Sequence, residues 1–291
     1  MTNLGIFKPR DIHWPVCRML LPRTVEHSTR YEYRIAIERG SASILGAAAF
    51  IDDGKGLRSL QLHTVHNRRR QGVATQLLDH LAAEANKRKR GEISAGVNPR
   101  SEIALHAFLI SRGLAVRDRL CTAEGDLHEI FARQLARCRR LADIKAADWQ
   151  IIPLSPEMLA DAGKLLAEHI SRLAPLEGAT YFVAPERAGL GLSQALVAAG
   201  ALQGILLMSR TADTVTFEAR AVNPAFRNTR ASAMLLTHAL KGAVETGASR
   251  LRFCYTNTGR DTVAVVKRLG LQVIDTVDHL VRDVGTSEVV R

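Results

Sequence analysis

A run of arginines, a glycine and small residues stands directly ahead of a leucine-rich segment, in the sequence RRRQGVATQLL. Backbone N–H groups at the start of a helix can hold a diphosphate, and the helix dipole favours its negative charge. Gly72 has no Cβ, so the backbone there can approach phosphates closely and bend freely. The small side chain of Ala74 leaves room for the ligand at the next turn. Arg68, Arg69 and Arg70 can add charge-assisted hydrogen bonds. The run therefore predicts a site for a phosphate-bearing ligand.

An exposed basic helix cap is the alternative interpretation of this run, and it would also account for the arginines and the glycine. We favour the ligand site because strand, turn and helix signals coincide here. The GK[ST] pattern of a phosphate-binding P-loop is absent, and so is the GxGxxG pattern of a dinucleotide site. A metal site is not expected, because the four cysteines are widely spaced and form no CxxC pair.

Hydrophobic periodicity places the run between a strand and a helix. The segment 71–90 has leucines and alanines at helical spacing, and Gly91 is placed to end that helix. In the first half of the chain we expect strands at 31–38, 43–51, 58–65 and 92–98 and helices at 71–90 and 101–111. In the second half we expect strands at 149–154, 194–199, 202–209, 214–222, 250–256 and 272–282 and helices at 156–170, 230–246 and 261–269.

The second half of the chain repeats landmarks of the first. FRNTRASAMLL matches RRRQGVATQLL when Arg69 is aligned with Arg227, an offset of 227 − 69 = 158 residues. Two further landmarks at nearly this offset are the pairs Gly46–Gly204 and Gly113–Gly270. A repeat of this length indicates two whole domains rather than a solenoid. We expect a first domain at 1–126, a basic helical connector at 127–147 and a second domain at 148–291.

The segment from Leu60 to Gly113 resembles the core of the GNAT N-acetyltransferase superfamily. The family signature is an Arg or Gln, two residues, a Gly, one residue and then a Gly or Ala, and residues 69–74 fit it. A small hydroxyl follows at Thr75, and two leucines come next. The resemblance implies an α/β (α+β) fold class with two tandem GNAT-like domains, each a mixed, splayed central sheet flanked by helices.

The resemblance also implies a reaction. An acetyl or other acyl group would pass directly from acetyl-CoA or another acyl-CoA to an amine, with no metal and no covalent enzyme intermediate. The pantetheine arm would lie between the strands at 58–65 and 92–98, where backbone N–H groups of Thr64 and Val65 would hydrogen-bond it and polarise the thioester. The residues implied to bind the cosubstrate's phosphates are Arg69, Arg70, Gln71, Gly72, Val73, Ala74 and Thr75.

Several positions depart from the family pattern. The tyrosine that often protonates the leaving thiolate is replaced by Leu109 in the first copy and by Val266 in the second. The second copy has Arg230 in place of the glycine at the phosphate site. It keeps Glu218 where the family often places a base, while the first copy offers His63, whose imidazole suits proton transfer near neutral pH. Glu218 and His63 are the catalytic candidates, and the alternative for each is a solvated or half-buried side chain.

The uneven distribution of charge along the chain is compatible with three functions. Residues 1–145 hold 25 Lys and Arg against 15 Asp and Glu, a net charge of +10, and the remainder has a net charge of +1. A basic half suits a polyanion. The chain is therefore an N-acyltransferase, a CoA-binding or partner-binding module of weak or no turnover, or an RNA-directed enzyme with an aminoacyl-tRNA acceptor. The aromatic content of 5% gives base stacking little support.

The partner and the compartment are expected from what the sequence lacks. No motif identifies the acceptor amine, which can be a small molecule, a protein N-terminus or a lysine. The richest apolar stretch, at 195–208, is too short to cross a bilayer, so no membrane partner is expected. With four unpaired-looking cysteines and no apolar leader at the N-terminus, we expect the cytoplasm.

Overall fold

The chain forms two compact units, each described here by itself. The computed structural model describes residues 4–21, 30–41, 43–139, 149–170, 191–227, 229–257 and 260–284. Unit 1 comprises Met1–Arg117 together with Asp278–Arg291, and unit 2 comprises Asp118–Val277.

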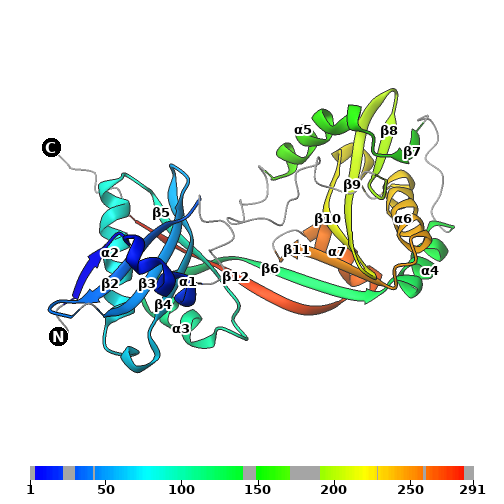
Figure 1. Cartoon of the computed structure of the whole chain (residues 1–291). Helices are drawn as coiled ribbons and strands as arrows, with labels where there is room; N and C mark the ends of the chain where they lie inside the picture. Colours follow the sequence, from blue (N-terminus) through cyan, green and yellow to red (C-terminus); the bar gives the residue numbers. More distant parts are fainter. Residues whose placement is uncertain are drawn as a thin grey trace. The chain divides into compact units, whose positions relative to one another are not determined.

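Unit 1 is a mixed sheet between helices, with strands in the order β1-β2-β3-β4-β5-β12 (Figure 1). Its elements are β1 (Leu4–Phe7), α1 (Trp14–Leu20), β2 (Glu32–Glu38), β3 (Ile44–Asp52), β4 (Gly56–Thr64), α2 (Val73–Lys87), β5 (Glu92–Val97), α3 (Ile103–Ser111) and the end of β12 (Gln272–Asp283). Alternate residues of β3 face opposite sides of the sheet, as in any strand. Ala48 and Phe50 pack with α2 and α3, while Ala47 and Ala49 pack with α1.

Unit 2 is built on the same plan, with strands in the order β6-β11-β10-β9-β8-β7. Its elements are β6 (Ala115–Asp126), α4 (Leu127–Cys138), β7 (Trp149–Pro153), α5 (Leu159–Ile170), β8 (Gln194–Ala198), β9 (Ala201–Thr211), β10 (Thr214–Val222), α6 (Arg230–Glu245), β11 (Arg250–Thr256) and α7 (Arg260–Leu269). Helix α5 packs on one face of the sheet, α6 and α7 pack on the other, and α4 packs on α6. The expected mixed, splayed sheet flanked by helices is confirmed in both units.

The bounds of the units differ from the expected domain bounds because the last strand of each copy in sequence pairs within the other unit. Strand β6 follows the last helix of the first copy but pairs antiparallel with β11 in unit 2. The end of β12 closes the second copy in sequence but pairs antiparallel with β5 in unit 1. Unit 1 therefore ends at Arg117 rather than 126 and includes the C-terminal residues. The helix expected in the connector is present as α4, and residues 140–148 lie outside the described residues.

Backbone pairing supports the duplication with a single offset. The same strand pairs and loop bonds occur in both units, displaced by 158 residues along the chain. They are the pairs Gly46–Thr64 and Gly204–Val222, the pairs Gly56–Glu92 and Thr214–Arg250, and the N–H···O bonds Val65–Leu45 and Asn223–Gln203. Side chains differ at most of these positions, so the shared feature is the backbone.

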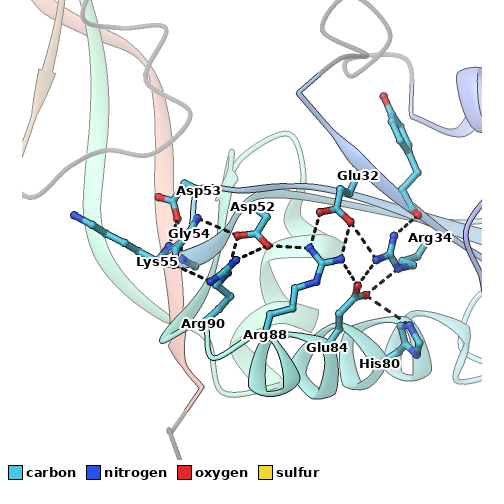
Figure 2. A network of polar contacts seen from close by, with 12 residues as sticks. Glu32, Arg34, Asp52, Asp53, Gly54, Lys55, His80, Glu84, Arg88 and Arg90 are labelled. Atoms are coloured by element: carbon cyan, nitrogen blue, oxygen red, sulfur yellow. Dashed lines mark hydrogen bonds and ion pairs between the residues drawn. The ribbon is translucent and has the colours of Figure 1, made fainter.

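A network of ion pairs fixes α2 against the sheet of unit 1 (Figure 2). Arg34, only 3% exposed, donates from Nε to Oε2 of Glu84 at 2.8 Å. Arg88 bridges Glu32 at 2.5 Å and Asp52 at 2.9 Å. Both guanidinium groups lie over the ring of Phe50, at 5.2 and 5.8 Å from its centroid. The network joins the C-terminal half of α2 to β2 and to the end of β3.

Asp52 stays ionised within this network. Its burial opposes the charged form, but hydrogen bonds from Arg90 and Arg88 and from the Gly54 N–H outweigh that effect and lower its pKa to about 2. The carboxylates of the network are therefore charged at neutral pH, as their arginine partners require.

Removing the Glu84 carboxylate should destabilise the protein strongly. We expect Glu84→Gln to lower the free energy of unfolding by about 2–4 kcal/mol, because the buried Arg34 loses its closest charged partner and keeps only the longer pair with Glu32, at 3.3 Å. The matched control is Glu245→Gln, which removes an exposed helical pair with Lys241 and should change stability by about 0.5 kcal/mol or less. Urea unfolding followed by circular dichroism measures both, and equal losses would contradict this assignment.

Candidate functional site

The loop that follows β4 bends sharply before α2 begins. After Thr64 the chain makes a short 3-10 turn at His66–Arg68. Arg70 and Gly72 then adopt left-handed backbone, with φ of 63° and 83°. Gly72 is the N-cap of α2, and a Cβ added there would meet no atom within 4 Å. Glycine is favoured at this position by its backbone angle and not by crowding.

This bend exposes a row of backbone N–H groups. The first bond of the helical ladder runs from the N–H of Gln76 to the carbonyl of Gly72, at 3.0 Å. The N–H groups of residues 70–75 precede it, and no acceptor among the described residues bonds to them. Residues 70–72 are exposed, whereas the side chain of Val73 is buried in the core and anchors the turn. The row has the position and accessibility that an anion site requires.

Arginine side chains surround the loop. Arg68 lies 3.5 Å from a carboxylate oxygen of Glu38. Arg69 and Arg70 are exposed, and neither pairs with a carboxylate of the described part of the chain. Together with the dipole of α2, these groups give the loop a positive potential.

Strands β4 and β5 border a gap next to this loop. They pair in parallel only at their first residues, Gly56 with Glu92 and Leu57 with Ile93. Beyond Leu57 the two strands part, while β4 remains paired with β3 as far as Thr64. The splay expected from the sequence is therefore present in unit 1.

Only one of the two backbone groups expected to face this gap does so. Val65 donates its N–H to the carbonyl of Leu45 on β3, at 3.0 Å. Because successive N–H groups of a strand point in opposite directions, the N–H of Thr64 points away from β3. The expectation for Val65 was wrong for this reason, and Thr64 is left as the candidate donor.

His63 is half-buried on β4, and its side chain is held largely neutral. Burial lowers its pKa below the usual value of 6.5, and the positive charge of Arg69 lowers it further. A neutral imidazole at pH 7 can accept a proton. His63 and the arginine of the loop are thus electrostatically coupled.

Neither α3 of unit 1 nor α7 of unit 2 has a tyrosine at the position where the GNAT superfamily often has its proton donor. Leu109 and Val266 are 1% and 3% exposed and lie in the cores of their units. The two helices end alike, with Leu114 and Leu271 donating N–H groups to the carbonyls of Leu109 and Val266 at 3.1 and 3.2 Å. The positions correspond, and both are apolar.

Unit 2 has its own gap, between β10 and β11, and this gap holds a cavity. The strands pair from Thr214 to Phe217, and β10 then shifts its register against β9 at Glu218. The cavity is open to solvent, and Glu218, Cys254 and Tyr255 are among the residues that line it. Ser209 donates its hydroxyl to the Glu218 carboxylate. Unit 2 therefore places a carboxylate where unit 1 has the buried Leu60.

Sequence reasoning did not find three polar neighbours of Glu218. Ser209 lies across the β9–β10 pair, while Cys254 and Tyr255 come from β11. Burial raises the pKa of the Cys254 thiol, the Glu218 carboxylate raises it further, and burial also raises the pKa of Tyr255. The expected strands 202–209 and 250–256 contained the needed signal, but only the pairing register shows which of their residues meet.

The start of α6 differs from the start of α2. Thr229 is the N-cap, and its hydroxyl accepts the N–H of Ser232 at 3.3 Å. Arg230 occupies the place of Gly72, as the offset of 158 predicts. Part of the N–H row is therefore closed in unit 2 and open in unit 1.

In the described ranges, no three or more His, Cys, Asp or Glu side chains gather as a metal site would require. No described helix is both long enough and apolar enough to span a bilayer.

Comparison with known proteins identifies the fold. No family model and no curated protein matches the chain. A GCN5-related N-acetyltransferase from Sphaerobacter thermophilus superposes with a TM-score of 0.60 and 12% identity, over 97% of this chain and 96% of that one. A tandem GNAT protein from the clavulanic acid biosynthesis pathway gives a TM-score of 0.59 and 16% identity, over 98% of this chain and 100% of that one.

A third structure extends the likeness. A probable N-acyltransferase from Enterococcus faecalis V583 gives a TM-score of 0.64 at 9% identity, over 98% of this chain and 74% of that one. The chain thus has the tandem GNAT fold over nearly its whole length, as its resemblance to that superfamily implied.

The coupling of His63 to Arg69 should appear in its titration. We expect a midpoint below 6.5 in the native protein and a higher one in Arg69→Gln, because removing the positive charge favours the imidazolium. Nuclear magnetic resonance of the histidine rings measures this. His238, whose pKa is lowered by burial and by Lys241, is the internal control and should not move.

The lowered pKa of His63 also makes the stability of the folded protein depend on pH. The unfolded chain protonates His63 at a higher pH than the folded chain does, so its contribution to stability is lost as the pH falls below about 6.5. An unchanged His63 midpoint in Arg69→Gln would refute the coupling.

Proposed function

We propose that the protein is an N-acyltransferase that moves an acetyl or other acyl group from an acyl-CoA to an amine, with the acyl-CoA bound by unit 1. The observation that carries this proposal is the exposed N–H row of residues 70–75 beside the gap between β4 and β5. The GNAT fold supports it, because that fold surrounds the row with the elements such transfer uses.

The residues of unit 1 would divide the work of binding. The N–H groups from Arg70 to Thr75 would hold the diphosphate, and Arg69 and Arg70 would add charge-assisted bonds. The pantetheine arm would enter the gap, where the N–H of Thr64 would donate to the thioester carbonyl and stabilise the negative charge that develops on its oxygen. The chain itself would form no covalent bond with the acyl group.

The transfer needs a proton acceptor and a leaving group. A neutral amine attacks the thioester carbon, a C–N bond forms, and the C–S bond breaks to release the CoA thiolate. His63 in unit 1 or Glu218 in unit 2 would take the proton of the amine, directly or through water. Because a thiol has a pKa near ~8.5, its thiolate can leave and be protonated by water without the missing tyrosine.

A second function is favoured by one observation. Leu109 and Val266 are buried apolar residues at both positions where the family often has its proton donor. A CoA-binding module with little turnover would tolerate that substitution. Radiolabelled acetyl-CoA with a panel of amines separates the two, because the enzyme must transfer label faster than acetyl-CoA hydrolyses alone.

Compartment and partner follow from the same proposal. The acceptor would be an amine on a small molecule or on a protein. The four cysteines are free thiols, which suits a reducing compartment such as the cytoplasm.

The binding site is tested by a charge placed at Gly72. We expect Gly72→Glu to weaken the binding of CoA by roughly ten- to a hundredfold in calorimetry, because a carboxylate at the helix start repels the diphosphate. Gly40→Glu is the matched control: Gly40 also has a positive φ, of 88°, and open space around its Cβ. Both variants carry the same backbone strain, so equal affinities in the two would overturn the assignment of the cosubstrate site.

The catalytic base is tested by separate substitutions in the two units. If Glu218 is the base, Glu218→Gln should lower kcat by about a hundredfold or more while leaving CoA affinity unchanged, because the amide cannot accept the proton. His63→Gln gives the corresponding test in unit 1, and Glu157→Gln, at an exposed site before α5, is the control. Unchanged turnover in Glu218→Gln would remove Glu218 from the reaction.

A further inference from the structure

Apolar side chains form much of the wall of the cavity between β10 and β11 in unit 2. Leu120, Phe217, Ala219 and Phe253 all line it, and all four are buried. The rings of Phe217 and Phe253 pack edge to face, with their centroids 5.5 Å apart, and the ring of Tyr255 follows at 6.3 Å from that of Phe253. Walls of this kind suit a ligand that carries an apolar or aromatic group.

A single carboxylate, that of Glu218, lies among these walls. Ser209 donates its hydroxyl to Oε1 of Glu218, and within the described part of the chain no other donor bonds to this carboxylate and no cation pairs with it. The bond to Ser209 orients the carboxylate and leaves Oε2 for a ligand. The charge of Glu218 also acts inside the cavity, because it adds to the effect of burial in raising the pKa of the Cys254 thiol.

The other charged residue that lines the cavity is Arg220. It follows the bend at Glu218, and its Nη2 donates to the hydroxyl of Ser232 on α6, at 2.5 Å. Although both residues line one cavity, Glu218 and Arg220 form no ion pair with each other. A ligand cation is therefore attracted to the Glu218 side of the cavity and repelled from the Arg220 side, which gives it one orientation.

The cavity does not suit the long anionic ligand expected in unit 1. At the start of α6, Thr229 accepts the N–H of Ser232, and Arg230 stands in place of the glycine of unit 1. The carboxylate at the bend of β10 repels an anion as well. What the gap offers is an acceptor for a positive charge next to buried aromatic rings.

We propose that this gap binds a small amine that carries an apolar or aromatic group, with its ammonium on Glu218 and its apolar group against Phe217 and Phe253. Identifying that amine as the acceptor rests on the proposed function, whereas its binding does not. Unit 1 lacks the site, since the buried Leu60 stands where unit 2 has Glu218.

Phenethylamine is the probe for this site, titrated by calorimetry in the absence of any acyl-CoA. We expect saturable binding. Two matched compounds should bind at least about tenfold more weakly, namely phenethyl alcohol, which lacks the charge, and ethylamine, which lacks the ring.

The matching variant is Glu218→Gln. It should lower the affinity for phenethylamine by about tenfold or more, because the amide has no charge, although its oxygen can still accept the hydroxyl of Ser209. Glu157→Gln, at an exposed site of the same unit, is the control and should bind the probe as the native protein does.

Backbone amide resonances locate the bound probe. We expect the amides of residues 217–219 and 253–255 to shift with its concentration and those of residues 70–75 to stay in place. Absence of saturable binding, equal binding of phenethyl alcohol, or equal binding by Glu218→Gln would overturn the proposal.

Added acetyl-CoA tests the identity of the acceptor separately. Phenethylamine should be acetylated with a kcat/KM about tenfold or more above that of ethylamine, because the ring adds binding energy in the cavity. Equal values for the two amines would overturn the assignment of the acceptor class. Acetylation of no amine would count against the proposed function, while the amine site, established by binding alone, would stand.

Discussion

The N–H groups at the start of α2 impose the constraint around which unit 1 is organised. A helix always begins with donors that lack partners, and most helices cap them with a side chain. At the start of α2, Gly72 has left-handed backbone, and no described acceptor bonds to the N–H groups of residues 70–75. At the other end of the helix, Arg34, Glu84 and Arg88 hold α2 against β2 and β3.

The two units share a backbone and differ in chemistry. Strand pairs and loop bonds recur with one offset, yet unit 1 keeps the open helix start and unit 2 keeps the carboxylate at the bend of β10. Each copy also supplies the closing strand of the other unit, because β6 pairs with β11 and the end of β12 pairs with β5. Unit 2 is the continuous segment Asp118–Val277, whereas unit 1 is made of two segments, so its sheet is complete only when the end of β12 pairs with β5.

Local pattern predicted most of the elements. Strands β10 and β11 have the predicted bounds, because turns and helices flank their apolar runs on both sides. Helix α2 begins two residues later than expected, since Gly72 takes the left-handed cap. The short β1 and α1 and the strongly charged β6 were not predicted: their stability comes from tertiary partners and not from their own periodicity.

Features that depend on strand register or on pairing between distant residues could not be predicted from the sequence. The direction of the Val65 N–H is set by which residue of β3 it faces, and no pattern in β4 reveals that. Arg34 and Glu84 are 50 residues apart in the chain, so no local pattern pairs them. The unit bounds depend on the exchanged strands in the same way.

The central claim is that the open helix start of unit 1 seats the acyl-CoA. Backbone amide resonances followed during a titration with CoA test it most directly. The account predicts that the amides of Thr64 and of residues 70–75 shift together and saturate, while those of residues 230–233 in α6 stay in place. Shifts confined to the start of α6, with residues 70–75 unmoved, would contradict it.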